Sequence, residues 1–175
     1  MKFFANKTYR MITIALIVLF SIVFGAVPCA ASTNESYYAS IANKINEFIN
    51  NPNWSDGATW GYYKEPIDST YSSIGCCAYV ADFAKYVYGT NDLYNGDSRY
   101  YDINDIQAGD VVYMRNYDDS SGHWFAVLKR DGNTLTCAEG NWAGGMVVIG
   151  KTRTINASAG RFDEDNIRYF RYGIR

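Results

Sequence analysis

The sequence predicts an α+β domain in which N-terminal helices pack on an antiparallel β-sheet. Apolar residues recur at helical spacing in two segments before residue 90, and five short segments after residue 109 are rich in valine, isoleucine, threonine and aromatic residues. Helices followed by a block of short strands are typical of this class. No internal repeat or low-complexity linker interrupts this order, so we expect a single domain.

The N-terminal segment 1–31 has the pattern of a secretory signal peptide. An uncharged apolar run, from Met11 to about Val27, follows three basic residues and precedes a proline and small residues. This run is short for a transmembrane helix of about 20 residues and does not end in charges, which disfavours a membrane anchor. We therefore expect cleavage after Ala30 or Ala31, secretion to the cell wall or the medium, and no membrane partner afterwards.

Residues 32–175 are predicted to form the single catalytic domain, because their number suits one domain with a substantial core. Three of the 16 basic residues lie in segment 1–31 and none of the 18 acidic residues does, so 13 basic and 18 acidic residues remain, a net charge of −5. Non-specific nucleic-acid binding needs a basic surface, so we expect no nucleic-acid partner.

The first helix is predicted over Glu35–Asn50, where apolar residues recur at roughly helical spacing. The segment Asn51–Ser73 is rich in asparagine, aspartate, glycine and aromatic residues without a clear period, which indicates a long structured loop. A second helix is predicted to begin near Cys76 and to end at Gly89. Three residues are candidates for its N-terminal cap: Ser72, Ser73 and Gly75.

The strands are predicted where short segments combine β-branched and aromatic residues. The turn Arg130–Asn133 contains Asp-Gly and predicts a hairpin between the second and third strands. The predicted strands are Asp110–Arg115, His123–Lys129, Thr134–Glu139, Met146–Lys151 and Ile167–Tyr172.

His123 is the only histidine in the sequence, and the pair Cys76 and Cys77 lies at the expected start of the second helix. A cysteine nucleophile needs a thiolate, which a neighbouring imidazole and the N-terminus of a helix both favour. These residues therefore suggest a cysteine hydrolase. Removal of segment 1–31 leaves three cysteines, so at least one thiol is unpaired, and a disulfide between Cys77 and Cys137 would leave Cys76 reactive.

Four ordered segments carry a resemblance to a known family. They are Cys76–Val80 (Cys-Cys-Ala-Tyr-Val), Ile106–Val112 (with Gly-Asp before two valines), Gly122–Leu128 (Gly-His before apolar residues) and Ala138–Trp142 (Ala-Glu-Gly-Asn-Trp). Together they resemble the CHAP domain, a cysteine, histidine-dependent amidohydrolase/peptidase of the papain-like, NlpC-related superfamily. The resemblance covers about residues 70–145 and implies a papain-like cysteine hydrolase fold.

The resemblance also implies the role of each catalytic residue. Cys76 would be the nucleophile, because the family's aromatic residue follows three positions after that cysteine, and Cys77 is the less favoured alternative. His123 would be the general base, Glu139 the third member and Asn141 a polar partner. Glu139 and Asn141 are two residues apart, so on a strand their side chains face the same side, and either could contact the imidazole.

Aromatic residues near these motifs are candidates for substrate binding. The sequence has 16 tyrosines and 4 tryptophans, whose flat faces pack on sugar rings and whose polar groups hydrogen-bond to peptides. One oxyanion donor is expected from the backbone N–H of Cys76, and the second could come from Tyr71, Tyr62 or Tyr63. The expected substrate-binding residues are Trp60, Tyr62, Tyr71 and Trp142.

The resemblance and the export signal imply a secreted enzyme that cleaves amide bonds of bacterial peptidoglycan through a thioester on the cysteine. Two other classes stay open: a non-catalytic module that binds glycans or proteins, and a cysteine protease or acyltransferase that acts on proteins. We expect no cofactor and no metal, since the acidic segment Asp102–Asp105 matches no EF-hand loop. An inhibitory protein partner is compatible with the sequence, which does not identify one.

Overall fold

A computed structural model describes residues 32–69, 72–89, 99–116, 118, 120–142, 144–163 and 168–174, with the backbone alone for 32–38 and 168. Residues Tyr38–Arg175 form one compact unit. The predicted signal peptide and Tyr71 lie outside the described residues. None of the helices in this part of the chain is long and apolar enough to cross a membrane.

Two α-helices confirm the helix predictions: α2 (Ser32–Asn50), which begins three residues earlier than expected, and α3 (Gly75–Tyr88). α3 ends at Gly89 as predicted. This glycine has left-handed backbone angles (φ 76°) and donates its N–H to the carbonyl of Lys85. Glycine is favoured there because it adopts positive φ without steric cost.

The N-terminus of α3 differs from the prediction. Ile74 occupies the N-cap position with extended backbone, and no side chain caps the helix, so the expected role of Ser72 or Ser73 is wrong. Gly75 instead donates its N–H to the carbonyl of Lys64 at 2.8 Å. The backbone of the preceding loop therefore satisfies a group that a serine hydroxyl would otherwise bind.

Seven antiparallel strands form the sheet, and five of them confirm predicted strands, each of which extends further at its C-terminal end than predicted. β1 and β6 were not predicted, because two residues carry no periodic pattern. Two 3-10 turns lie between β1 and β2 and between β5 and β6: η2 (Ile103–Asp105) and η3 (Ala157–Ala159). The strands are β1 (Arg99–Tyr100), β2 (Val111–Asn116), β3 (Gly122–Asp131), β4 (Thr134–Trp142), β5 (Met146–Asn156), β6 (Arg161–Phe162) and β7 (Arg168–Ile174).

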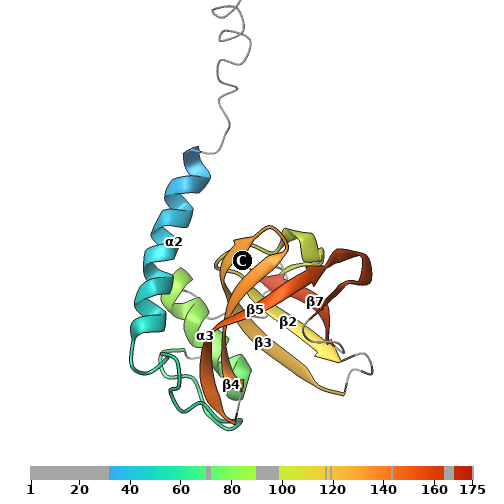
Figure 1. The fold of residues 1–175 in the computed structure, drawn as a ribbon. Helices are drawn as coiled ribbons and strands as arrows, with labels where there is room; N and C mark the ends of the chain where they lie inside the picture. The colour runs from blue at the N-terminus through green and yellow to red at the C-terminus, as the bar shows by residue number, and fades with distance from the viewer. Residues whose placement is uncertain are drawn as a thin grey trace, which may run out of the picture. The chain divides into compact units, whose positions relative to one another are not determined.

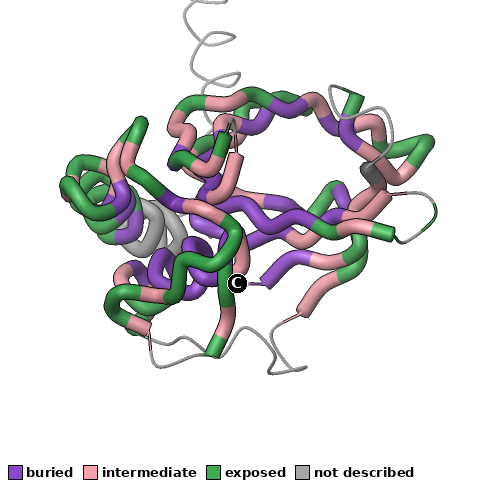
Figure 2. Tube along the Cα trace, turned by 90° about the horizontal axis from the view of Figure 1, so that it is seen from below, coloured by how far each residue is buried: buried purple, intermediate pink, exposed green. Residues whose placement is uncertain are grey.

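The sheet closes on itself. The strand order is β1-β7-β2-β3-β4-β5-β6, and β6 also pairs with β7. Strands β2 to β7 therefore form an antiparallel barrel, which the tube in Figure 2 shows as a ring. The predicted antiparallel sheet is confirmed, whereas its closure was not predicted.

Apolar side chains form two cores. One fills the barrel interior, and the other lies between the helices and the outer face of β3 and β4, against which α3 packs (Figure 1). Along β3, Phe125 and Val127 belong to the interior core and Trp124 and Ala126 to the helix side, as strand alternation requires. The structure is thus an α+β domain with two helices packed against a seven-stranded antiparallel sheet.

A buried carboxylate fixes the loop between the helices. Asp82, on α3, accepts hydrogen bonds from the indole N–H of Trp54 at 2.9 Å and from three backbone N–H groups in residues 67–69 at 2.8 to 2.9 Å. These donors satisfy both oxygens of a side chain that is fully buried. The described part of the predicted loop is therefore ordered and held against α3.

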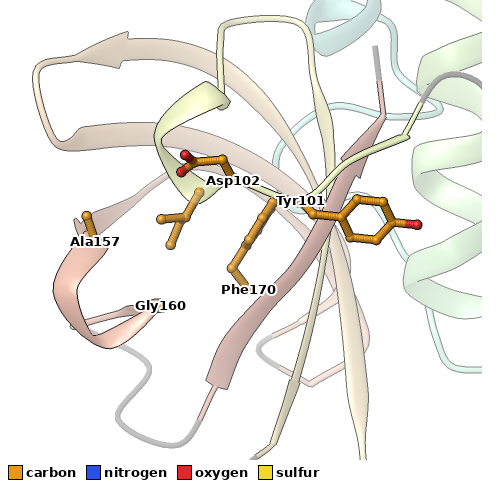
Figure 3. A pocket seen from close by; sticks show the side chains of 6 residues that line it. Tyr101, Asp102, Ala157, Gly160 and Phe170 are labelled. Carbon is orange, nitrogen blue, oxygen red and sulfur yellow. The ribbon is translucent and has the colours of Figure 1, made fainter.

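An open pocket of about 420 Å³ lies between η2 and η3 (Figure 3). The ring of Tyr101 points away from the other side chains of this pocket. At the end of β3 opposite to His123, Arg130 donates hydrogen bonds to the carbonyls of Asn104 and Ile106, next to η2. The pocket and the predicted active site therefore lie at opposite ends of the barrel. The pocket is lined by none of the predicted site residues but by Tyr101, Asp102, Ile103, Ala157, Gly160 and Phe170.

Candidate active site

Cys76 is the second residue of α3. The peptide dipoles and unpaired N–H groups of a first helical turn favour a negative charge at this position. The thiol forms a hydrogen bond with the imidazole of His123 and interacts with the backbone N–H groups of Cys77 and Trp124. Cys76 is also partly exposed, so a substrate can reach it. The structure thus brings the predicted nucleophile and the predicted base together.

Gly75 lets the loop approach the start of α3 closely. Its φ of 62° lies in the left-handed region, and a Cβ atom there would lie 2.9 Å from the carbonyl oxygen of Tyr62. Its carbonyl accepts a hydrogen bond from the indole of Trp60 at 2.8 Å. Any larger residue would displace the helix start, and with it Cys76, so glycine is required here.

His123 lies at the start of β3 and is only 4% exposed. Its Nε2 lies 2.9 Å from Oε2 of Glu139, on β4. An ionised carboxylate only accepts hydrogen bonds, so Nε2 carries the proton and Nδ1 is the ring nitrogen that faces Cys76. The structure therefore assigns the contact with the imidazole to Glu139 and not to Asn141.

The pKa values of Cys76 and His123 shift in opposite directions. Burial alone would raise the pKa of the thiol, but the hydrogen bond and charge of His123 outweigh it and lower this pKa below its ordinary value. For His123, burial alone would lower the pKa, but the hydrogen bonds of the imidazole to Cys76 and Glu139 outweigh this effect and raise the pKa above its ordinary value. Both shifts favour the thiolate–imidazolium form of the pair, in which the sulfur is nucleophilic.

Glu139 contacts a second cation inside the barrel. Its Oε1 accepts a hydrogen bond from Nη1 of Arg153, on β5, and both side chains are completely buried. Burial would raise the pKa of Glu139, but His123 and Arg153 together lower it to about 2. The carboxylate is therefore ionised at neutral pH and can hold the imidazole.

The backbone at Asn141 differs from the regular strand that the prediction assumed. The strand register shifts between Glu139 and Trp142, and Asn141 has left-handed backbone angles (φ 56°). The simple alternation that the prediction assumed therefore does not hold. The Nδ2 atom of Asn141 lies 3.4 Å from the position that a Cβ atom on Gly75 would take. Its amide thus lies beside the first turn of α3.

Trp142 borders the imidazole, in agreement with its predicted place at the site. Its ring centroid is 4.8 Å from that of His123, and Nζ of Lys151 lies 3.5 Å from the Trp142 ring centroid. Aromatic faces attract positive charge, so the indole is compatible with an imidazolium beside it. The side chain is half-buried and keeps part of its surface open at the site.

The other predicted substrate-binding residues have different surroundings. Trp60 is completely buried, with its ring 5.4 Å from that of Tyr79, so it offers no surface to a ligand. This prediction is corrected: Trp60 supports the helix start through its hydrogen bond to Gly75. Tyr62 is 61% exposed, and its backbone adjoins Gly75, so its ring is available at the edge of the site. Tyr71 lies outside the described residues.

The other two cysteines of the described chain differ from Cys76. None of the three is in a disulfide, so the conceivable disulfide between Cys77 and Cys137 is not formed. Burial raises the pKa of Cys77 and of Cys137 to about 12, whereas that of Cys76 is lowered. A thiol with so high a pKa forms little thiolate at neutral pH. The electrostatics therefore favour Cys76 over its neighbour as the nucleophile.

Sequence patterns did not identify Arg153 or Asp82. Arg153 lies beyond Lys151, the predicted end of its strand, and two residues before Ile155, which faces the barrel interior. Asp82 directly precedes Phe83 on the buried side of its helix. In each case the sequence places a charged residue where the pattern of neighbouring residues predicts a buried apolar side chain, and this mismatch is the feature that could have identified it.

The three central groups form a hydrogen-bonded series of nucleophile, base and orienting acid, the arrangement that activates a cysteine for acyl transfer. Among the described residues, no group of three or more histidine, cysteine, aspartate or glutamate side chains is arranged to hold a metal ion. No protein-family model matches the chain, and no curated protein is significantly similar to it in sequence.

Proposed function

We propose that the protein is an exported cysteine amidohydrolase or endopeptidase that cleaves amide bonds of bacterial peptidoglycan. One observation carries the proposal: Cys76 has a lowered pKa beside His123, whose Nε2 is bound to the buried Glu139 at 2.9 Å. A nucleophile at a helix N-terminus and a base on a neighbouring strand agree with the papain-like arrangement that the sequence motifs imply.

In the first half of the proposed reaction, the Cys76 thiolate attacks the carbonyl carbon of the scissile amide. The carbonyl electrons move to the oxygen, and backbone N–H groups at the start of α3 would stabilise the oxyanion. The imidazolium of His123 then gives its Nδ1 proton to the leaving nitrogen. The C–N bond breaks, an amine departs, and the acyl group remains on Cys76 as a thioester.

In the second half, a water molecule attacks the thioester while His123 accepts its proton at Nδ1. The tetrahedral intermediate expels the sulfur as a thiolate and releases a carboxylic acid, so one water is consumed for each amide cleaved. Glu139 stays ionised and accepts the Nε2–H bond throughout. This bond keeps Nδ1 directed at the sulfur in both halves.

The substrate class is inferred mainly from the sequence. The signal peptide predicted over residues 1–31 would export the chain, and its motifs resemble those of a family that hydrolyses wall amides. The exposed ring of Tyr62, whose backbone adjoins Gly75, and the half-buried ring of Trp142, next to His123, offer aromatic surface near the site. Such surface suits the sugar rings and peptides of peptidoglycan.

The alternative of a non-catalytic binding module is disfavoured by the cysteines. That module would have a structural cysteine, whereas Cys76 is a free, partly exposed thiol with a lowered pKa. A protease or acyltransferase that acts on proteins would use the same three groups. Only an assay of the substrate separates this class from a wall hydrolase.

Incubation of the purified protein with peptidoglycan under reducing conditions tests the proposal. We expect release of new amino groups and loss of turbidity, abolished by Cys76→Ala and retained by Cys77→Ala, a matched control at the adjacent position. Intact peptidoglycan together with a Cys76 that resists iodoacetamide would contradict the proposal and favour the binding module. Intact peptidoglycan together with a reactive Cys76 would contradict the proposed substrate and favour a protease or acyltransferase that acts on proteins.

A further inference from the structure

Arg153 reaches the active site from inside the barrel. It is paired with Leu135 in the register of β4 and β5, and its side chain is completely buried. Its guanidinium carbon lies 4.4 Å from the ring centroid of Phe125, a member of the interior core. From this position Nη1 donates a hydrogen bond to Oε1 of Glu139.

Stability alone does not explain the pair of Arg153 and Glu139. Removing two charges from water is costly, and apolar side chains of similar volume often stabilise a core as well as a buried ion pair does. The barrel already has an interior made of apolar side chains from β2 to β6. A charged pair in that interior is therefore better explained by a role in the site that it adjoins.

The two oxygens of Glu139 have separate partners. Oε2 faces Nε2 of His123 at 2.9 Å, and Oε1 faces Arg153. Rotation of the carboxylate about its last bond would break both contacts, so each contact fixes the other. The guanidinium is planar and lies over the ring of Phe125, which makes it a stiffer support than a lysine ammonium would be.

We propose that Arg153 is a positioning residue of the active site. By binding Oε1 it fixes the carboxylate of Glu139 so that Oε2 accepts the Nε2–H bond, and His123 is thereby held with Nδ1 toward Cys76. The inference rests on the proposed cysteine hydrolase function. It adds a fourth residue to the series, one that touches neither the substrate nor the reacting atoms.

Nitrogen-15 NMR of the imidazole tests this role directly. His123 is the only histidine in the sequence, so in an untagged protein the histidine signals come from this site alone. Above the titration of His123, the wild-type ring is expected in the Nε2–H tautomer. Arg153→Met is expected to convert it to a mixture of tautomers, and Arg153→Lys to restore part of the Nε2–H population.

A matched control is Arg130→Met, which removes an arginine at the opposite end of β3. It is expected to leave the tautomer unchanged. A folded Arg153→Met protein whose neutral imidazole remains entirely Nε2–H would overturn the inference. So would an Arg130→Met protein that shows the same mixture, because the effect would then not be specific to Glu139.

A second measurement serves if Arg153→Met fails to fold, since that variant removes one of the two cations that face the buried carboxylate of Glu139. Glu139→Gln with Arg153→Met removes both charges. In a Cys77→Ala background, the rate of Cys76 alkylation by iodoacetamide is followed against pH. Glu139→Gln is expected to move the acid limb upward by about one pH unit, and the added Arg153→Met to move it no further.

A further shift of similar size in the double variant would show that Arg153 acts independently of Glu139, and the inference would be wrong. Neither measurement uses peptidoglycan. A protein that meets both expectations but does not cleave the wall therefore overturns the proposed substrate and supports the role of Arg153.

Discussion

The helix–loop layer and the barrel interior each contain a completely buried carboxylate, Asp82 in the first and Glu139 in the second. Both carboxylates accept hydrogen bonds at both oxygens. The donors of Asp82 are neutral, one indole and three backbone N–H groups. The donors of Glu139 are His123 and Arg153, whose side chains carry or can take a positive charge.

This difference indicates that the chemistry of the donors, and not burial, distinguishes a functional carboxylate from a structural one. Neutral backbone donors belong to a segment of chain, so Asp82 fixes the position of a loop. A titratable donor links the carboxylate to the protonation of its neighbour, so Glu139 affects the state of His123 and, through it, Cys76.

The largest expected effect is that of Glu139→Gln on amide cleavage. The glutamine amide would donate to Nε2, where the carboxylate accepts, so Nδ1 would carry the proton and could not accept one from the thiol. We expect kcat to fall by about 10³- to 10⁴-fold. Steady-state kinetics on soluble peptidoglycan fragments, with circular dichroism as a check of the fold, measure this. A decrease of only a few-fold would contradict the role given to Glu139.

Asp82→Asn is the matched substitution in the helix–loop layer. Its amide nitrogen would face two of the donors that now bind an oxygen, which is expected to lower the free energy of unfolding by about 1–3 kcal/mol. The kcat of the folded fraction should stay close to that of the wild type. If urea unfolding shows no loss of stability while kcat falls as in Glu139→Gln, the contrast between the two carboxylates is wrong.

The second prediction concerns acid stability. The pKa of Glu139 is about 2 in the folded protein against an ordinary value of 4.5, so its ionised form stabilises the fold above pH 4.5 and this contribution is lost as the pH falls toward 2. The difference corresponds to about 3 kcal/mol. His123 has the opposite sign: its raised pKa contributes stability below pH 6.5 that is lost as the pH rises through the folded value.

Urea unfolding at a series of pH values, for the wild type and Glu139→Gln, measures this contribution. The free energy of unfolding of the wild type should fall more steeply between pH 4.5 and pH 2 than that of the variant, which lacks the titrating carboxyl. Parallel curves would mean that Glu139 contributes nothing to the acid dependence of stability.

Local patterns predicted most of the fold. The two helices and five strands follow from periodicities that neighbouring residues carry. Barrel closure depends on β6, which has two residues and pairs with β7 at one position, Arg161 with Tyr169. So short a contact between distant segments leaves no periodic trace, and a non-local pairing cannot be read from a single sequence.

The site shows the same limit at the level of side chains. Cys76, His123 and Glu139 could be predicted because their motifs occur in order along the chain. Arg153 could not, because its contact with Glu139 arises from the pairing of β4 with β5 and from the length of its side chain. Trp60 lies in the same aromatic loop as exposed side chains but is completely buried, with its indole N–H bound to the carbonyl of Gly75.

Tyr62 lies in that same loop as Trp60, but its ring is 61% exposed, and it is the basis of the third and smallest prediction. Tyr62→Ala is expected to raise KM several-fold with little change in kcat, because it removes aromatic surface that would bind substrate and transition state alike. The stability should change by less than about 0.5 kcal/mol, as is usual at exposed positions.

Tyr101→Ala, at a tyrosine that is 70% exposed beside the pocket at the other end of the barrel, is the matched control and should leave KM unchanged. Equal KM values for the two variants would mean that the substrate does not extend over Tyr62, and the binding surface would then be limited to the side of the site bordered by Trp142.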